Sequence, residues 1–182
     1  MQQRPGSQIK QRGNRQAYSL KSFRVLAVED YPFMADLIAM MLREFGVGHI
    51  VQAINSQEAK EVLTLFNSES SDPRNAIDIV IVDWLMPDGD GPSFLKWIRE
   101  HRKAQIKFLP TILCSAYASE DVVRVARDTG ANEALVKPVS AIKLAQRILH
   151  VVDHPRSYVK TPDFFGPDRR RREEKFRGED RR

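Results

Sequence analysis

Five short apolar or β-branched runs alternate with helical patterns between residues 23 and 152, and this alternation restricts the fold more than any other feature. The runs are Arg24–Val28, His49–Ile54, Ile77–Val82, Thr111–Ser115 and Glu133–Val136. The third run is apolar at every position but one, as expected of a central parallel strand that is covered on both faces. Strands that alternate with helices predict an α/β fold with a doubly wound, five-stranded parallel sheet.

Between these runs, apolar residues recur at three- and four-residue spacing, which predicts helices, the first of them over Pro32–Phe45. Pro32 and Pro92 suit the first turn of a helix, where proline costs no hydrogen bond. Ser119 is expected to cap the helix that follows it. Gly46 and Gly130 are expected to end helices in the left-handed conformation.

The net charge of +5 is unevenly distributed along the chain. Residues 1–24 carry +6 and residues 155–182 carry +4, which leaves −5 for residues 25–154. An acidic folded part argues against a nucleic-acid-binding core, although basic tails can contact phosphates. We therefore divide the chain into a basic arm (1–22), one folded domain (23–152) and a basic C-terminal extension (153–182).

Cys114 is the only cysteine, which excludes an internal disulfide framework and suits a reducing cytoplasm. It lies within an apolar run and is interpreted as a small buried hydrophobe. The sequence contains no apolar run of the length needed to span a bilayer, and the first residues lack the apolar core of a secretory signal. We expect a cytoplasmic protein without membrane insertion.

Polar side chains stand at the carboxyl ends of four of the five predicted strands. Glu29 and Asp30 follow the first strand, Asp83 follows the third, Ser115 closes the fourth and Lys137 follows the fifth. Ligands of doubly wound sheets bind outside these strand ends, so the five side chains can converge on one pocket. Carboxylates offer the hard oxygen ligands that suit Mg²⁺, and a cation would help to keep crowded acids ionised.

The same set of residues could accept a phosphoryl group. The carboxylate of Asp83 is a nucleophile able to form an acyl phosphate. A phosphoryl group in this pocket needs its charge neutralised, and a metal ion, Lys137 and the Ser115 hydroxyl could each take one of its oxygens.

Four segments in this order resemble response-regulator receiver domains of the CheY-like kind. Val25–Asp30 resembles their first strand and acidic pair, and Asp83–Gly91 resembles the phosphoacceptor and the loop that follows it. Ser115–Ala116 resembles the hydroxyl residue with its small neighbour, and Lys137–Pro138 the lysine with its proline. The resemblance covers about residues 23–152 and implies a flavodoxin-like sheet with strand order 2-1-3-4-5.

The resemblance implies a role for each acidic residue. Asp83 would be the phosphorylation site. Asp30, Asp83 and the backbone carbonyl of Leu85 would bind Mg²⁺ or Mn²⁺ directly, and Glu29 would act mostly through water. The phosphoryl donor would be a sensor histidine kinase or a histidine phosphotransfer protein.

The resemblance also implies how the phosphoryl group is held. Ser115 would move toward it and Lys137 would pair with it. Ala116, being small, would leave the donor room to approach, and Pro138 would follow a cis peptide bond.

The chain departs from the family pattern at Ala134, where an aromatic residue that swings inward is usual. We hypothesise that Tyr117, two residues after Ser115, replaces it as the moving aromatic; the alternative is that Tyr117 only packs over its loop. In this family the positions of Leu85 and Tyr117 help to set how fast water hydrolyses the acyl phosphate. Neither side chain carries a carboxylate or amide to orient that water and both are bulky, so we predict a long-lived phosphorylated state.

The output is expected to be a protein–protein contact, because the residues after Val152 are too poor in apolar side chains for a second core. In the family the face formed here by Ser119–Val152 often makes such a contact or a homodimer. The protein is therefore interpreted as a signalling domain, not an enzyme beyond its own phosphorylation and dephosphorylation.

The segment Thr161–Arg172 of the extension resembles C-terminal extensions of stand-alone receivers, and the resemblance implies no role for Phe164–Arg172. Phe164 and Phe165 could contact a partner or the domain itself, while Arg169–Arg172 meet an acidic surface. A solvated tail is the third interpretation.

Two rival functions stay open at this point. A degenerate receiver would bind partners without being phosphorylated, since Ala134 breaks the usual switch. A nucleic-acid-binding protein would work through both basic tails. A phosphatase with an aspartyl nucleophile is disfavoured, because Leu85 stands where the second aspartate would be needed.

Overall fold

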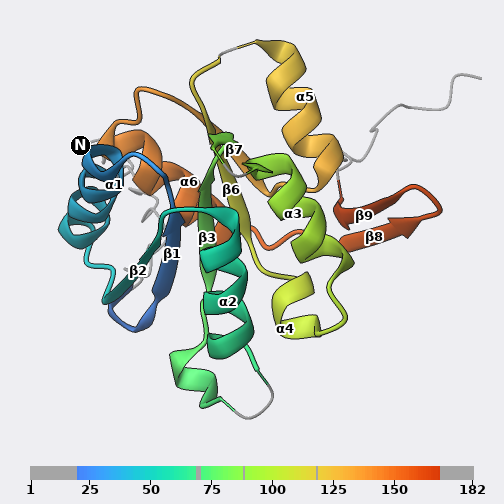
Figure 1. The fold of residues 1–182 in the computed structure, drawn as a ribbon, viewed down its shortest axis with the longest axis horizontal. Helices are drawn as coiled ribbons and strands as arrows, with labels where there is room; N and C mark the ends of the chain where they lie inside the picture. Colours follow the sequence, from blue (N-terminus) through green and yellow to red (C-terminus); the bar gives the residue numbers. More distant parts are fainter. Residues whose placement is uncertain (1–19, 69–70, 88, 118, 169–182) are drawn as a thin grey trace, which may run out of the picture.

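A computed structural model describes residues 20–68, 71–87, 89–117 and 119–168. Its centre is a five-stranded parallel sheet with the order β2-β1-β3-β6-β7 (Figure 1). Because β6 and β7 are the fourth and fifth strands of this sheet along the chain, the predicted order 2-1-3-4-5 is confirmed. The strands are β1 (Arg24–Val28), β2 (His49–Ala53), β3 (Ile79–Asp83), β6 (Thr111–Ser115) and β7 (Glu133–Val136).

Two strand ends differ from the prediction for local reasons. β2 stops before Ile54, because the Ile54 N–H donates to the side chain of Glu58 instead of a neighbouring strand. β3 begins two residues late and includes Asp83. The Asp78 carboxylate accepts the N–H of Arg24 at 2.8 Å and so fastens the entry of β3 beside β1.

Six α-helices in the described ranges connect or follow these strands. They are α1 (Pro32–Glu44), α2 (Ser56–Phe66), α3 (Gly91–Glu100), α4 (Ala104–Lys107), α5 (Glu120–Thr129) and α6 (Ala141–Asp153), with short 3-10 helices η1 (Leu20–Ser22) and η2 (Pro73–Asn75). The predicted cap is present, since the Ser119 hydroxyl accepts the N–H of Val122. Gly46 and Gly130 end helices with positive φ as expected.

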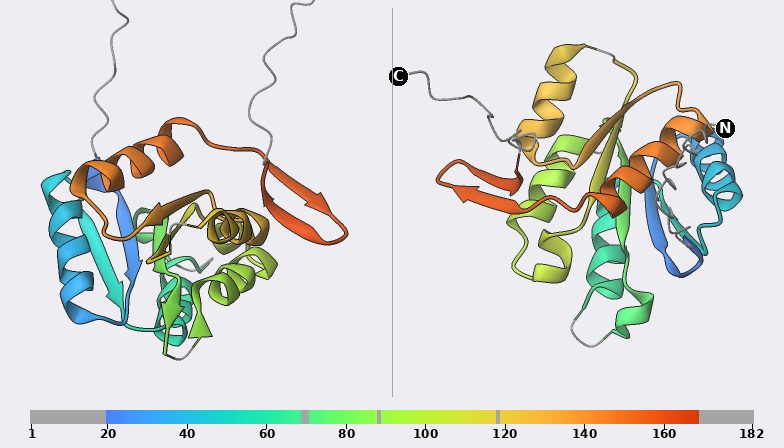
Figure 2. Two further views of the ribbon diagram at one scale, coloured as in Figure 1. Left: turned by 90° about the horizontal axis from the view of Figure 1, so that it is seen from above. Right: turned by 180° about the vertical axis from the view of Figure 1, so that it is seen from behind.

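The helices cover both faces of the sheet, as the apolar strands require. Alternate residues of β1 point to opposite sides: Leu26 belongs to the apolar cluster that includes side chains of α2, α3 and α5, whereas Val25 belongs to the one that includes side chains of α1 and α6. Figure 1 and Figure 2 show these two layers of helices with the sheet between them. Within the described residues, no helix is both long and apolar enough to cross a membrane.

Two small hairpins add to the predicted architecture. β4 (Leu85–Met86) and β5 (Gly89–Asp90) pair directly after the third strand of the sheet. β8 (Tyr158–Thr161) and β9 (Phe164–Pro167) pair after α6, and this C-terminal hairpin projects from the side of α3 and α5 (Figure 1).

The C-terminal hairpin answers one question that the sequence left open. The ring of Phe165 lies 5.4 Å from that of Phe108, and the Lys107 amine lies 4.1 Å from the centre of the Phe165 ring. Phe165 therefore contacts the domain itself. The predicted Arg169–Arg172 contact lies outside the described residues.

Candidate functional site

The carboxyl ends of β1 and β3 bring three acidic side chains together. Glu29 and Asp30 follow β1, and Asp83 ends the neighbouring strand β3. One carboxylate oxygen from each lies within 4.8 Å of the others. Parallel strands place their carboxyl ends at one edge of a sheet, which is why residues 53 positions apart meet here.

Asp83 is buried and its carboxylate is held in one orientation. The Oδ1 atom accepts the N–H of Trp84 at 2.8 Å and lies 2.9 Å from the amine of Lys137. The backbone at the start of α3 also lies close to Asp83: a Cβ added at Gly91 would lie 2.3 Å from the carbonyl oxygen of Asp83. Only glycine allows α3 to begin this near to the strand end.

Lys137 reaches the acidic cluster from the end of β7. Its N–H donates to the Ser115 carbonyl at 2.7 Å, and its amine lies 2.7 Å from Glu29 Oε2. The peptide bond to Pro138 is cis, as the resemblance implied. One lysine thus bridges Glu29 and Asp83, which a sequence pattern could not show.

Burial and pairing act on the acid–base properties of this cluster. Burial raises the pKa of the Glu29 carboxyl, although the hydrogen bond from Lys137 opposes the shift. Burial alone would lower the pKa of Lys137, but the hydrogen bonds to Glu29 and Asp83 outweigh it and the pKa is raised. Lys137 is therefore a stable cation that compensates two buried carboxylates.

Ser115 closes β6 on the other side of Asp83, since Asp83 pairs with Cys114 in the sheet. The Ser115 hydroxyl is buried and accepts the N–H of Tyr117 at 3.0 Å. Ala116 and Tyr117 are exposed above it. Ser115 thus ends the strand next to the one that carries Asp83, and its hydroxyl is already engaged within its own loop.

The remaining predicted residues take different positions. Leu85 lies in β4 with its side chain 55% exposed, immediately after the acidic strand end. Ala134 lies in β7 opposite Leu113 and packs against the apolar core. Its small side chain leaves this strand without the aromatic residue that is usual in the family.

The donor set suits a divalent cation with a preference for oxygen. Three carboxylates converge, and Asp30 is half-buried at the rim of the cluster. Three carboxylates without a compensating cation are costly, and a single lysine compensates only part of their charge. Glu29, Asp30 and Asp83 are the residues that would hold Mg²⁺, which also retains water ligands.

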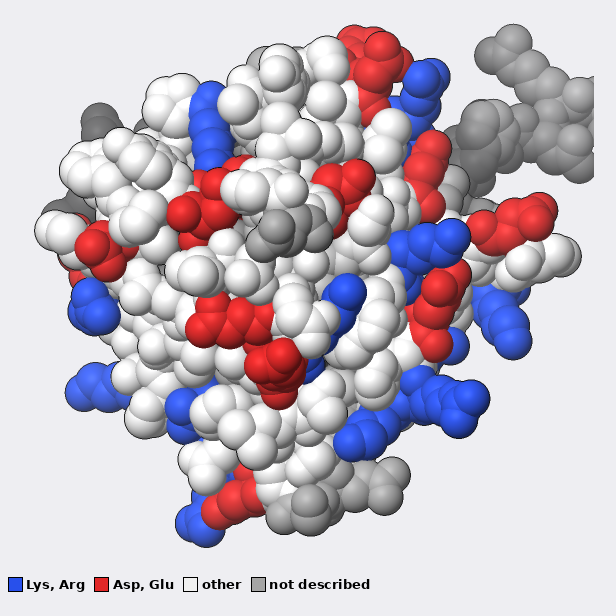
Figure 3. Space-filling model, viewed as in Figure 1, with Lys and Arg blue, Asp and Glu red and all other residues white. Residues whose placement is uncertain are grey.

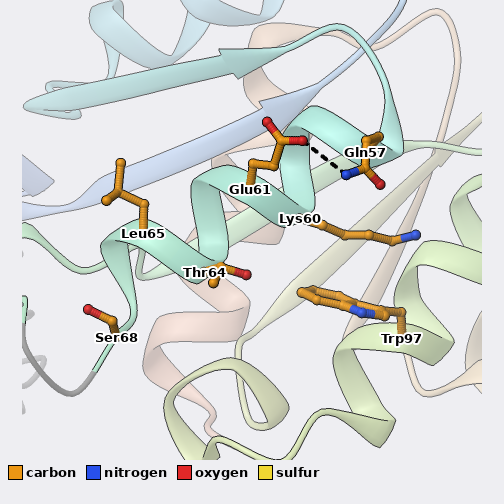
Figure 4. A pocket seen from close by; sticks show the side chains of 7 residues that line it. All are labelled: Gln57, Lys60, Glu61, Thr64, Leu65, Ser68 and Trp97. Carbon is orange, nitrogen blue, oxygen red and sulfur yellow. Dashed lines mark hydrogen bonds between the residues drawn. The ribbon is translucent and has the colours of Figure 1, made fainter.

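A groove of about 490 Å³ lies elsewhere, between α2 and α3. The Lys60 amine lies 5.9 Å from the centre of the Trp97 ring at one side of it, and Leu65 lines the other end (Figure 4). None of the predicted site residues lines this groove, so it is separate from the acidic cluster.

The sequence and the fold are both similar to known signalling proteins. Chemotaxis protein CheY-3 of Vibrio cholerae is 30% identical over 128 residues, which are 70% of this chain and 90% of that protein. CheY of Pseudomonas aeruginosa is 28% identical over 125 residues, 69% of this chain and 92% of that protein. The CheX-CheY-BeF3-Mg+2 complex from Borrelia burgdorferi matches with 32% identity and a TM-score of 0.59, covering 71% of this chain and 89% of that one.

Residues 25–149 match the sequence profile of the family described as "Response regulator receiver domain". The matched range includes the acidic cluster and the lysine that contacts it, from Glu29 to Lys137. The chain therefore belongs to the response regulator receiver domain family.

Proposed function

We propose that this two-component response regulator accepts a phosphoryl group on Asp83 from a phosphohistidine donor, with Mg²⁺ or Mn²⁺ in the acidic cluster. The observation that carries the proposal is the Lys137 amine 2.9 Å from Asp83 Oδ1, within a cluster of three carboxylates. A sensor histidine kinase or a histidine phosphotransfer protein would supply the donor.

The transfer forms one bond and breaks another. A carboxylate oxygen of Asp83 attacks phosphorus while the bond from phosphorus to the donor imidazole nitrogen breaks, and that nitrogen keeps the electron pair. A bound Mg²⁺ supplies charge neutralisation for the transferring oxygens. Lys137 contributes a second positive charge, and Ser115 contributes a hydroxyl once it leaves Tyr117.

Exposed apolar side chains around the site support the approach of a protein donor. Tyr31, Ile54, Leu85 and Tyr117 each follow a strand that ends at this edge of the sheet, and each is more than half exposed. Phe33 continues the surface along α1. Apolar side chains that rim a polar centre are typical of protein-binding surfaces.

The output is proposed to leave through the face of Ser119–Val152, which comprises α5, β7 and α6. Its exposed apolar side chains are Val123, Val125, Ile142 and Leu149. A downstream protein or a second copy of the chain could bind there. On the face drawn in Figure 3, acidic and basic side chains of the described residues are interspersed, and that face carries no broad basic area of the kind that duplex binding requires.

Beryllofluoride with Mg²⁺ tests the proposal. The full chain should bind this phosphoryl mimic and take up phosphate from acetyl phosphate, and Asp83→Asn should abolish both. Asp36→Asn, an exposed aspartate on α1, is the matched control and should leave both intact. Phosphate uptake by Asp83→Asn would contradict the assignment, and no response from the unaltered chain would favour a phosphorylation-independent binding module.

A further inference from the structure

The helix that follows Ser115 is weakly packed along its length. Of the ten residues of α5, all described, only Ala126 is buried. Val123 and Val125 are 46% and 40% exposed, and the ion pair of Arg124 is with Asp121 of the same helix. Few buried side chains therefore fix α5, and the way its two ends are held contributes to its position.

The carboxyl end of α5 is held by the C-terminal hairpin. Gly130 caps the helix with φ of 98°. A Cβ added at Gly166 of β9 would lie 2.9 Å from the Gly130 Cα, and one added at Gly130 would lie 3.1 Å from the Phe165 carbonyl oxygen. The backbone of β9 thus lies directly against the end of α5.

A buried arginine connects the same helix end to α3. The Arg99 side chain donates to the carbonyl oxygens of Gly130, Lys107 and Leu109, each at 2.9 Å, and to Asn132 Oδ1 at 3.1 Å. These acceptors are all neutral, and burial lowers the pKa of Arg99 to about 10. A guanidinium in such a cage orders every segment that supplies an acceptor.

The hairpin covers this cage with aromatic side chains. The ring centre of Tyr158 lies 5.2 Å from the Arg99 guanidinium carbon, and the Tyr158 hydroxyl donates to the Phe108 carbonyl at 3.0 Å. The rings of Tyr158 and Phe165 lie 5.0 and 5.4 Å from that of Phe108. Figure 2 shows the hairpin extending from this attachment, beyond the body of the domain.

The amino end of α5 is joined to the phosphoacceptor pocket. Ser119 caps the helix, and the loop before it begins at Ser115, whose hydroxyl accepts the Tyr117 N–H. If the hydroxyl turns toward a phosphoryl group on Asp83, this hydrogen bond must break and the loop must shift. A shift of the loop pulls on one end of α5 while the hairpin holds the other.

We propose that the β8–β9 hairpin is a clamp on α5: it holds the helix in the position of the unphosphorylated protein and opposes the shift that the phosphoryl group drives. The coupling to phosphorylation rests on the proposed function, whereas the hold on α5 does not. Because coupling between two sites is reciprocal, releasing the hairpin strengthens binding of a phosphoryl mimic, and the bound mimic loosens the hairpin.

Hydrogen exchange of the full chain without any mimic tests the hold on α5. Gly166→Ala places a methyl group against Gly130 and should raise amide exchange over 120–129 by about threefold or more. Lys160→Ala, an exposed substitution on β8, is the matched control and should leave these rates unchanged. Equal α5 exchange in the two variants would overturn the clamp.

Titration with beryllofluoride and Mg²⁺ tests the coupling. Binding is followed by the fluorescence of Trp84, and every protein carries Trp97→Phe so that Trp84 is the one tryptophan left. Gly166→Ala should bind the mimic about three- to tenfold more tightly than Lys160→Ala. In the unaltered chain saturated with the mimic, amide exchange over 158–167 should be faster than without the mimic. Unchanged or weaker binding would overturn the coupling. Should Gly166→Ala fail to fold, Tyr158→Phe removes one hydroxyl and should show a smaller change in the same direction.

The two proposals fail in different ways. If the unaltered chain does not bind beryllofluoride while Gly166→Ala still frees α5, the phosphoacceptor function is wrong and the clamp on the helix stands. If the chain binds the mimic but hairpin variants match the control in both measurements, the clamp is wrong and the phosphoacceptor function stands.

Discussion

At the scale of single residues, Lys137 takes part in more than one interaction of the site. Its amine contacts Glu29 and Asp83, both of them also candidate metal ligands. In the resting protein the lysine therefore competes for the oxygens that a cation needs, although it compensates their charge. The same amine is proposed to pair with the phosphoryl group.

Replacing Lys137 should separate these two effects. In Lys137→Ala we expect Mg²⁺ to bind more tightly, because no ammonium competes for the carboxylates, while the affinity for beryllofluoride falls at least about tenfold through loss of a charge-assisted contact. Fluorescence titration of Trp84 measures both constants, with Lys143→Ala on α6 as the control. Weaker Mg²⁺ binding in Lys137→Ala would show that the lysine organises the site more than it competes for it.

The side chains of Leu85 and Tyr117 lead to a prediction about the lifetime of the acyl phosphate on Asp83. Neither side chain carries a carboxylate or amide to orient an attacking water and both are bulky, so the phosphorylated state should persist for minutes, on the order of the slow acyl-phosphate hydrolysis expected without a general base. Leu85→Asn should shorten it several-fold, whereas Leu65→Asn, at an exposed leucine on α2, should not. Loss of radiolabelled phosphate measures the decay. A half-life of a few seconds in the unaltered chain would refute the prediction.

Tyr117 is also the hypothesised moving aromatic in place of the missing one at Ala134. Beryllofluoride should change its side-chain rotamer, because the Ser115 hydroxyl must release the Tyr117 N–H. A crystal structure with the mimic, or ring chemical shifts, would report the rotamer. An unchanged ring would mean that Tyr117 only covers its loop.

At the scale of elements, the start of α3 is fitted to the end of β3, the strand that carries Asp83. In Gly91→Ala the new methyl group would meet the Asp83 carbonyl and a Leu113 methyl, at 2.3 and 2.8 Å. We expect a loss of about 1–3 kcal/mol in the free energy of unfolding, together with weaker Mg²⁺ binding as Asp83 is displaced. Chemical denaturation measures the first, with Lys96→Ala on the exposed side of α3 as the control. A stability equal to that of the control would mean that α3 can move away freely.

Some of these elements could be predicted from the sequence and others could not. Periodicity placed the five strands and their helices, since those patterns follow from burying one or two faces. The strand-end rule located Asp83 and Lys137. Neither principle could find the C-terminal hairpin, because the tail forms no core of its own. Arg99 likewise reads as a solvated residue of an amphipathic helix until its acceptors, distant in sequence, are in place.

At the scale of the whole molecule, Cys114 offers a probe of global unfolding. The thiol is fully buried in the inner strand β6, and burial raises its pKa to about 12. At neutral pH it should therefore be neutral and inaccessible, so an aromatic disulfide reagent should react only as fast as the domain opens. One thiol per chain should react rapidly in denaturant. Rapid reaction of the native protein would mean that the sheet opens locally at β6.

The compensation of three acids by one lysine has a consequence in formal charge. Glu29, Asp30, Asp83 and Lys137 together carry −2, which one divalent ion would cancel. Converting Asp83 into its acyl phosphate replaces one negative charge by two, so the pocket with its divalent ion would then carry a net charge of −1. That uncancelled charge has no counter-ion in the cluster itself, and it can be relieved only by hydrogen-bond donors that lie outside it. The Ser115 hydroxyl, once it releases the Tyr117 N–H, is one such donor within the described residues.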